Sequence, residues 1–302
     1  MRKALVTGAN GFIGSALVRE LLAHGIEVIA VVRKNRNHIP ENVRGIECDL
    51  ANFCRLPEMI SDRDIDVVYH MAWSGSSGTL RSDYSLQLEN AKYTCDMVKI
   101  ADAMQIRRFV GAGTLAQIDC DSYISQNGSI PNPVSCYGSA KIAAQYMSKS
   151  VANSIGLDHV WCFISNTYGV GNAAMNFVDM AIQRMLKGER SAFTDGEQNY
   201  DLVYVSDTIC GLYLCGKYGK NNHSYYIGSG EPRKLKEYIK IIRDAVNPDI
   251  PIYFGEIPFR GVTLPLEKYN IETISRDTGY NPKIKFEDGI IKTVQWLREK
   301  NL

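Results

Sequence analysis

The first half of the chain alternates short, continuously apolar runs with longer segments whose apolar residues recur at helical spacing. The apolar runs predict strands over Lys3–Thr7, Glu27–Arg33, Gly45–Cys48, Asp66–Met71, Arg108–Ala112 and His159–Ile164. The segments with helical spacing predict helices over Phe12–His24, Tyr84–Met104 and Tyr137–Asn153. Strands that are apolar throughout need helices on both faces, so the pattern predicts an α/β fold with a doubly wound parallel sheet. Such folds bind their ligands at the carboxyl ends of the strands.

The alternation weakens after about residue 170. Glycine turns, shorter helical segments and the proline-marked stretch Pro248–Pro265 follow, and a last helix is predicted over Glu287–Lys300. We therefore expect residues 1–170 to form the main domain, with a return segment at about 202–230. Residues 171–302 are expected to form mainly a smaller C-terminal lobe that binds the substrate.

Charge and composition indicate a small-molecule partner. The 34 basic and 33 acidic residues leave a net charge of +1, which attracts neither nucleic acid nor a membrane surface. The eight cysteines include no CxxC pair and no histidine at zinc spacing, so we interpret them as reduced thiols and expect no metal. No apolar run approaches the roughly 20 residues of a membrane helix, and we expect a cytoplasmic protein.

A glycine-rich turn, Thr7–Gly14 (TGANGFIG), lies between the first predicted strand and the first predicted helix. Its three glycines permit a tight turn, a close approach of the backbone to a pyrophosphate, and close packing of the helix on the sheet. The helix N-terminus adds unpaired N–H groups and the positive end of a dipole. The turn therefore predicts the dinucleotide site of a Rossmann domain, formed by Gly8, Asn10, Gly11, Phe12, Ile13 and Gly14.

The end of the second predicted strand carries two cations, Arg33 and Lys34, and no acid. An acid at this point holds the ribose hydroxyls of NAD, whereas an arginine pairs with the 2′-phosphate of NADP. We predict NADP as the cofactor, with NAD as the alternative if the two cations form only a solvated basic loop. The ends of the third and fourth predicted strands are expected to complete the cofactor site with Asp49, Leu50, Met71 and Ala72.

Tyr137 and Lys141 are spaced as YxxxK, which places both side chains on one face of a helix. The ammonium is then expected to lower the pKa of the phenol from about 10 toward the operating pH, so that Tyr137 can act as an acid or a base. Tyr213 and Lys217 have the same spacing. They fall in a predicted helix after the Rossmann half, with no hydroxyl-bearing strand end before it, so we assign them to packing.

Thr114 stands at the end of the fifth predicted strand, where the chain reads Gly111–Thr114. Its hydroxyl can donate a hydrogen bond to a substrate carbonyl or alkoxide, with Tyr137 as the second donor. The alternative is a strand-end hydroxyl that is satisfied within the fold. We predict Thr114, Tyr137 and Lys141 as catalytic residues, with Thr114 also facing the substrate and the other two also contacting the cofactor.

Together these residues resemble the extended short-chain dehydrogenase/reductase family, of the NAD-dependent epimerase/dehydratase type that modifies nucleotide sugars. The glycine turn matches the signature of that family almost letter for letter. Weaker matches continue along nearly the whole chain: Asn90 and Thr94 in LENAKYT, Pro133–Gly138 before the tyrosine, Asn166–Gly169, a strand over Leu202–Asp207, Arg260–Gly261 and Tyr269–Pro282. The resemblance also implies a homodimer formed through the helices at 84–104 and 137–153.

A nucleotide sugar is the substrate that the resemblance implies. It places Asn166 against the substrate and makes Arg260 a candidate for the nucleotide diphosphate, a task that suits a guanidinium fork. Tyr200 stands where many members have an arginine for the diphosphate, so Tyr200 is a further candidate contact and other carbonyl substrates stay open. The 4,6-dehydratases have Asp-Glu directly after the threonine, whereas this chain has Leu115–Ala116. That difference argues against dehydratase chemistry.

Three functions are compatible with these residues. The first is a 4-keto reductase, in which hydride passes from NADPH to a keto sugar and Tyr137 protonates the oxygen. The second is a 4-epimerase that oxidises and re-reduces the same carbon on a retained NAD. The third is an NADP-sensing binding protein, and the joint presence of Thr114, Tyr137 and Lys141 argues against it.

Overall fold

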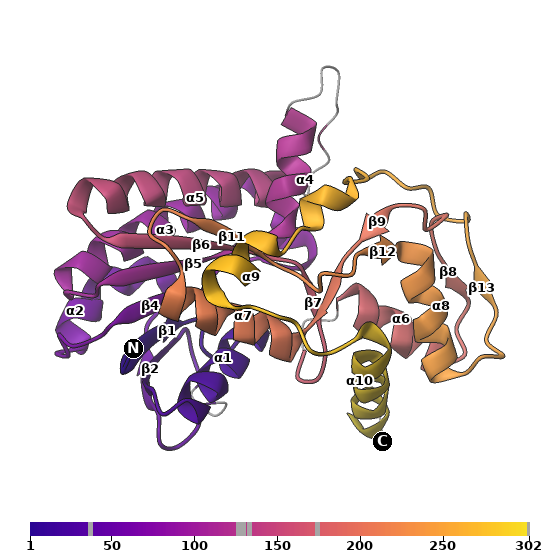
Figure 1. Cartoon of the computed structure of the whole chain (residues 1–302), viewed down its shortest axis with the longest axis horizontal. Coiled ribbons are helices and arrows are strands. Elements are labelled where there is room, and N and C mark those ends of the chain that lie inside the picture. The colour runs from indigo at the N-terminus through magenta and orange to yellow at the C-terminus, as the bar shows by residue number, and fades with distance from the viewer. Residues whose placement is uncertain (36–38, 125–130, 132–134, 173–175, 301–302) are drawn as a thin grey trace. The chain divides into compact units, whose positions relative to one another are not determined.

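The computed structural model describes residues 1–35, 39–124, 131, 135–172 and 176–300 (Figure 1). The chain forms two compact units, which we describe separately. The first unit comprises Met1–Ile164, Ile209–Ile227 and Glu272–Tyr280. The second comprises Ser165–Thr208, Gly228–Ile271 and the segment from Asn281 onward.

A parallel sheet of seven strands forms the centre of the first unit, in the order β11-β6-β5-β4-β1-β2-β3. The strands are β1 (Lys3–Thr7), β2 (Glu27–Val32), β3 (Arg44–Glu47), β4 (Val67–His70), β5 (Arg108–Thr114), β6 (Asp158–Ile164) and β11 (Ser224–Ile227). The chain builds outward from β1 to β3, then returns to place β4 on the other side of β1. This reversal is the switch point at which doubly wound folds bind their ligands. The predicted α/β fold is confirmed.

Helices cover both faces of this sheet, with α3 and α5 on one face and α1 and α7 on the other (Figure 1). The helical elements of the unit are α1 (Phe12–Ala23), η1 (Leu50–Arg55), α2 (Leu56–Met59), η2 (Gly78–Ser82), α3 (Tyr84–Ala103), α4 (Leu115–Ile124), α5 (Ser135–Ile155), most of α7 (Val205–Tyr218) and α9 (Glu272–Thr278). The core between the sheet and the α3/α5 layer contains Leu5, Ile29, Val68, Met97, Val98, Phe109, Ala144 and Trp161. Its buried apolar area holds the strand ends in a fixed arrangement.

The strand β5 is longer at its carboxyl end, next to the candidate site, than the sequence predicted. It continues to Thr114, two residues beyond the predicted end, and α4 follows at once. The helix that carries Tyr137 is therefore the second helix after β5, and it begins at Ser135. Of the predicted lead-in to that tyrosine, Pro133 and Val134 lie outside the described residues.

The predicted strand Leu202–Asp207 is wrong in its second half. β10 ends at Tyr204 and pairs with β7 (Asn166–Tyr168) in a two-stranded sheet, while α7 begins at the next residue. Within α7, buried Val205, Ile209 and Leu212 recur at helical spacing. That periodicity is the physical reason for the helix. The match to the family motif had suggested a strand instead.

The second unit contains short strands and four helical elements that the structure describes. Its remaining elements are α6 (Phe177–Leu186), β8 (Ser191–Ala192), β9 (Asn199–Tyr200), β12 (Arg233–Lys234), α8 (Leu235–Val246), β13 (Ile252–Tyr253), η3 (Leu266–Tyr269) and α10 (Phe286–Lys300). The predicted last helix begins one residue earlier than expected, at Phe286. None of the described helices is long and apolar enough to cross a membrane.

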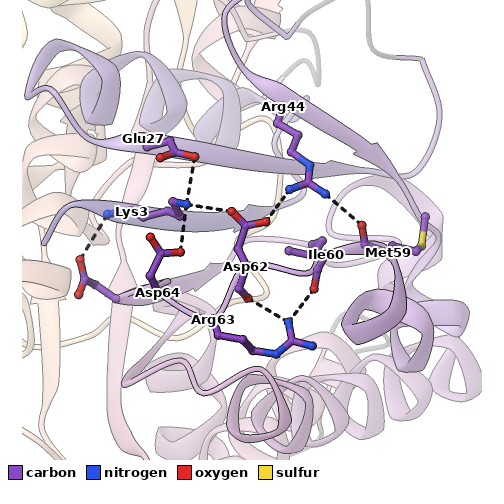
Figure 2. A network of polar contacts seen from close by, with 9 residues as sticks. Lys3, Glu27, Arg44, Met59, Ile60, Asp62, Arg63 and Asp64 are labelled. Carbon is purple, nitrogen blue, oxygen red and sulfur yellow. Dashed lines mark hydrogen bonds and ion pairs between the residues drawn. The ribbon is translucent and has the colours of Figure 1, made fainter.

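An ion-pair network ties together the amino ends of the sheet strands (Figure 2). The Lys3 ammonium lies 2.8 Å from the Asp62 carboxylate, 3.0 Å from that of Asp64 and 3.2 Å from that of Glu27. Arg44 from β3 pairs with the other oxygen of Asp62. Hydrogen bonds from Lys3 and then Arg44 hold the pKa of Asp62 below its usual range. The network lies at the edge opposite the ligand-binding edge, so we interpret it as structural.

Replacing Asp62 by asparagine is expected to lower the free energy of unfolding at pH 7 by about 1–3 kcal/mol, because two cations lose a charged partner. Since the folded pKa of Asp62 is depressed, this stabilisation is present above about pH 4 and is lost as the pH falls through the lowered pKa. Urea unfolding at pH 7 and at progressively lower pH measures it. Asp64→Asn is the matched control, because the Asp64 side chain is 64% exposed and its loss should cost at most about 1 kcal/mol. Equal losses for the two variants at pH 7 would contradict the assignment.

Candidate active site

The glycine turn after β1 lies against the end of β4. Gly8 has a φ of +65°, and a Cβ there would come within 2.8 Å of the Ala72 backbone nitrogen. A Cβ on Gly14 would come within 2.2 Å of the Gly8 carbonyl oxygen. Thr7 adds a further link, because its hydroxyl accepts a hydrogen bond of 3.2 Å from the Ala72 N–H. Both glycines are thus required by close backbone approach, and Met71–Ala72 borders the turn.

The N-terminus of α1 follows this turn without a side-chain cap. Gly11 is the N-cap residue, and no described side chain accepts a hydrogen bond from the first helical turn. Uncapped N–H groups at the positive end of a helix dipole form a site for an anion. This geometry fits the pyrophosphate of a dinucleotide, with Phe12, Ile13 and Gly14 supplying first-turn N–H groups. A capping side chain at Gly11 would have blocked the same space.

The ends of β2 and β3 lie beside the turn. The Asn10 side chain donates a 3.1 Å hydrogen bond to the Lys34 carbonyl oxygen, which connects the glycine turn to the end of β2. The side chains of Arg33 and Lys34 are exposed there. Asp49 caps η1 by accepting a hydrogen bond from the Ala51 N–H at 3.1 Å, and Leu50 is the first residue of that helix. The cofactor residues predicted from sequence therefore share the carboxyl edge of the sheet.

Tyr137 lies in the first turn of α5 and is only 8% exposed. Burial raises the pKa of the Tyr137 phenol above its ordinary value, while the charge of the Arg81 guanidinium and a hydrogen bond with the Thr114 hydroxyl, which faces the phenol, oppose that rise. Thr114 itself accepts a 3.3 Å hydrogen bond from the Ala116 N–H. Trp73 packs edge-on to the Tyr137 ring with centroids 6.0 Å apart. The two hydroxyls predicted to face a substrate oxygen are thus neighbours.

Lys141 shares the buried face of α5 with Tyr137, as the YxxxK spacing predicts. Its ammonium, however, contacts other groups than the Tyr137 phenol. It donates a 2.6 Å hydrogen bond to the Ala112 carbonyl oxygen and lies 3.7 Å from the centroid of the Trp73 ring. Its distance from the centroid of the Tyr137 ring is 6.0 Å. Burial lowers the pKa of Lys141 to about 7. The cation next to the phenol ring is instead Arg81, which sequence reasoning did not single out.

The segment between β4 and α3 positions Trp73 and Arg81, and two polar side chains of α3 fix it. The Gln87 amide accepts from the Trp73 indole at 2.8 Å and donates to the Leu80 carbonyl at 2.9 Å. The Asn90 side chain exchanges two hydrogen bonds of 2.9 Å with the backbone of Ser74. Asn90, which carried part of the family resemblance, therefore organises this segment.

Thr94, in α3, takes part in a series of polar contacts that leads through His70 to Thr7, at the start of the glycine turn. Its hydroxyl lies 3.5 Å from Nε2 of His70, and Nδ1 of the same ring lies 2.9 Å from the Thr7 hydroxyl. Burial, and then the charge of Lys141, lowers the pKa of His70 to about 3. The imidazole is therefore neutral at physiological pH and serves as a hydrogen-bonding link between β4, β1 and α3.

Tyr213 and Lys217, the second YxxxK pair, lie in α7 at the other edge of the sheet. The Lys217 ammonium donates a 3.1 Å hydrogen bond to the Tyr213 phenol. The Tyr213 ring stacks on His24 at 4.1 Å between centroids, and His24 ends α1 just before β2 begins. Because α1 ends at the amino edge of the parallel sheet, this pair is far from the carboxyl edge that carries Thr114.

The second unit carries three of the four residues predicted to bind substrate, namely Asn166, Tyr200 and Arg260. The Asn166 side chain lies 3.4 Å from the Tyr200 phenol and donates a 3.2 Å hydrogen bond to the Asp201 carbonyl oxygen. The structure thus brings Asn166 and Tyr200 together. Arg260 is exposed on the irregular stretch that follows β13.

Comparison with known proteins identifies the family. The sequence model of the NAD-dependent epimerase/dehydratase family matches residues 4–228, and the chain belongs to that family. A putative UDP-glucose 4-epimerase of Methanocaldococcus jannaschii is 26% identical over 98% of this chain and 99% of that protein. A dTDP-glucose 4,6-dehydratase of Actinoplanes sp. is 26% identical over 98% of each chain. The protein is therefore an enzyme of the extended short-chain dehydrogenase type, as predicted.

Solved structures give the same fold. The UDP-glucose 4-epimerase of Thermotoga maritima, solved with UDP-glucose, superposes with a TM-score of 0.84 at 22% identity and covers 99% of this chain and 100% of its own. A dTDP-glucose 4,6-dehydratase of Bacillus anthracis, solved with NAD, superposes with a TM-score of 0.77 at 21% identity, over 100% of this chain and 98% of its own. These likenesses support the doubly wound fold and the topology of the sheet.

Proposed function

We propose that the protein transfers hydride between a nicotinamide cofactor and a carbonyl or hydroxyl carbon of a nucleotide sugar, with Tyr137 as the acid–base residue. The observation that carries this proposal is the pair of neighbouring hydroxyls, Thr114 and Tyr137, at the carboxyl edge of the sheet that also carries the glycine turn. Two hydroxyls at that edge can donate to one substrate oxygen as its charge develops. The names of the relatives support nucleotide sugars as the substrate class.

The residues of the first unit have separate tasks in this mechanism. The bound dinucleotide would supply the hydride acceptor or donor. Tyr137 gives a proton to the substrate oxygen during reduction and takes it back during oxidation, while Thr114 donates a hydrogen bond to the same oxygen. Lys141, held against Ala112 and Trp73, contributes positive charge beneath the site when it is protonated. Gly8, Gly11 and Gly14 would hold the pyrophosphate.

Two reactions use this machinery. A 4-keto reductase is the first candidate, because Arg33 and Lys34 suit an exchangeable NADPH. A 4-epimerase with a retained NAD is the second, and the UDP-glucose 4-epimerases among the relatives favour it. The deciding experiment is to identify any cofactor that copurifies, and then to assay UDP-glucose without added cofactor and a nucleotide 4-keto sugar with added NADPH. Bound NAD and epimerisation of UDP-glucose without added cofactor indicate the epimerase, whereas consumption of NADPH with the 4-keto sugar indicates the reductase. No turnover of any nucleotide sugar would contradict the proposal.

NADPH is expected to bind about 10- to 100-fold more tightly than NADH, because Arg33 can form a charge-assisted contact with the 2′-phosphate. Arg33→Asp should abolish or reverse that preference, since a carboxylate repels the phosphate and accepts from the ribose hydroxyls. Titration of the protein fluorescence with each cofactor measures the two affinities. Arg19→Asp makes the same charge change on the exposed side of α1 and should leave the preference intact. Equal affinities in the parent enzyme would refute the assignment of NADP.

Arg260→Ala is expected to raise KM for UDP-glucose by about 10- to 100-fold while leaving cofactor affinity unchanged, if this guanidinium binds the nucleotide diphosphate. Steady-state kinetics with saturating cofactor measure the change. Tyr200→Phe, which removes the hydroxyl beside Asn166, tests the alternative contact in the same assay. A normal KM in the Arg260 variant, together with a raised KM in the Tyr200 variant, would move the diphosphate contact to Tyr200.

A homodimer through α3 and α5 is part of the same proposal. Both helices expose large apolar side chains, among them Leu88 (59% exposed), Tyr146 (65%) and Met147 (56%). Apolar side chains gathered on two adjacent helices are typical of an interface. Sedimentation velocity of the parent and of a Tyr146→Glu, Met147→Glu double variant tests it, and a monomeric parent would exclude this dimer.

A further inference from the structure

Arg81 is a cation in the first unit that the mechanism above leaves without a task. It lies in η2, and its guanidinium carbon stands 4.5 Å from the centroid of the Tyr137 ring. The side chain is half-buried. Its Nε atom is shielded from solvent and has no hydrogen-bond partner within the part of the chain that the structure describes. An arginine is thus held over the face of the proposed acid–base residue.

The backbone on either side of Arg81 is fixed by hydrogen bonds. Gln87 donates to the carbonyl oxygen of Leu80, the residue just before Arg81, and to that of Gly75 at 3.0 Å. The same glutamine accepts from Trp73, which packs against the edge of Tyr137. One side chain of α3 therefore sets the position of both Arg81 and Trp73. The hydrogen bonds of Gln87 therefore fix the segment that carries the Arg81 guanidinium.

Two cations from two elements lie near the Tyr137 ring: Arg81 from η2 and Lys141 from α5. The charge of Asp119, from α4, interacts with Arg81. The Lys141 ammonium is farther from the ring than Arg81 and is engaged with Ala112. Burial raises the pKa of Asp119 to about 6, and the charge of the Arg81 guanidinium opposes that rise. Within the part of the chain that the structure describes, Arg81 is therefore the cation nearest to the Tyr137 ring.

We propose that Arg81 is a positioning residue for proton transfer, because its guanidinium over the Tyr137 ring stabilises the phenolate that forms when the phenol gives up its proton. In the oxidation direction the O–H bond of Tyr137 breaks beforehand and releases its proton to the solvent, and the phenolate oxygen then takes the proton of the substrate hydroxyl. In the reduction direction the same proton passes from the phenol to the substrate oxygen. The inference rests on the proposed role of Tyr137, but it concerns a property of the phenol that can be measured without a substrate.

Arginine suits this role because its side chain keeps its positive charge. A guanidinium stays protonated at every physiological pH, whereas burial lowers the pKa of Lys141 to about 7. Arg81 therefore keeps its full charge at pH values at which Lys141 loses part of its own. A cation within about 4–6 Å of an acid lowers its pKa by about 1–3 units. Arg81 thus opposes the effect of burial on Tyr137.

The test measures the ionisation of Tyr137 directly. The full-length protein is labelled with tyrosine carrying ¹³C at Cζ, and Tyr137→Phe assigns the resonance. Arg81→Gln is expected to raise the pKa of Tyr137 by about 1–2 units, and Arg81→Lys should raise it less because a charge remains. Arg190→Gln is the matched control, since it removes a guanidinium 3.9 Å from the ring of Tyr253 in the second unit. An unchanged Tyr137 pKa in Arg81→Gln, in a variant with a normal thermal unfolding curve, overturns the inference.

A second readout separates this inference from the proposed function. With UDP-glucose and a saturating cofactor, the limb of the pH–rate profile that reports Tyr137 should move upward in Arg81→Gln by the same amount as the measured pKa. A raised KM with an unmoved pH limb and an unmoved phenol titration would make Arg81 a substrate contact and would refute the inference. If no nucleotide sugar is turned over, the proposed function fails, and the titration of the phenol still decides the role of Arg81.

Discussion

Replacing Tyr137 by phenylalanine is expected to reduce turnover by about 10²- to 10⁴-fold, the range for the loss of a positioned acid–base group. The ring keeps its packing against Trp73 and Arg81, so folding and cofactor binding should change little. Only the hydroxyl that faces Thr114 is removed. Turnover of UDP-glucose or another nucleotide sugar found by screening measures the effect, followed at the nicotinamide absorbance for a net reduction and by product formation for an epimerisation.

The chain contains its own control for this experiment. Tyr213→Phe makes the same change in the same YxxxK spacing, but at the amino edge of the sheet, where Tyr213 stacks on His24 and accepts from Lys217. Its turnover should stay within about a factor of two of the parent, because the substitution removes only the hydrogen bond from Lys217, far from the carboxyl edge of the sheet. If Tyr137→Phe retains activity, or if Tyr213→Phe is the inactive variant, the assignment of the active site is wrong.

Lys141→Met is expected to reduce turnover by about 10²-fold and to weaken cofactor binding, because it removes the charge that lies against Trp73 and the Ala112 carbonyl. Methionine has a similar length, so the packing of α5 should persist. Single-turnover kinetics together with cofactor titration separate the two effects. Lys149→Met, on the same helix, removes an ammonium that donates to the Asn222 carbonyl and should leave both unchanged.

The Lys141→Met substitution should also change how the free energy of unfolding depends on pH. The pKa of Lys141 is about 7 in the folded protein and about 10.4 in the unfolded chain, so between these values the unfolded chain binds more protons. The contribution of Lys141 to stability therefore rises with pH across that window. The unfolding free energy of the variant minus that of the parent should fall between pH 7.5 and pH 9.5 in urea titrations. A difference that does not vary with pH would mean that Lys141 keeps an ordinary pKa in the folded protein.

The local parts of the fold were predictable because short-range physics decides them. Continuous apolar runs in β1, β2 and β4 needed cover on both faces, and the helical spacing between them supplied it. The glycines at 8 and 14 marked a close backbone approach that a Cβ forbids. Errors occurred where a motif match took precedence over periodicity, as in the strand proposed over Leu202–Asp207, whose second half is the start of α7.

By itself the sequence determined the doubly wound sheet, the phosphate-binding turn and the shared helix face of Tyr137 and Lys141, since each depends on residues close together in the chain. Only the tertiary structure decided which cation lies over the phenol. That choice depends on the path of the segment between β4 and α3, which Gln87 and Asn90 fix through hydrogen bonds across 7 to 16 residues. It depends also on the Ala112 carbonyl, 29 residues before Lys141, which draws the lysine ammonium away. Spacing within a helix sets the face on which a side chain lies, but contacts with distant segments set the direction of its charged end.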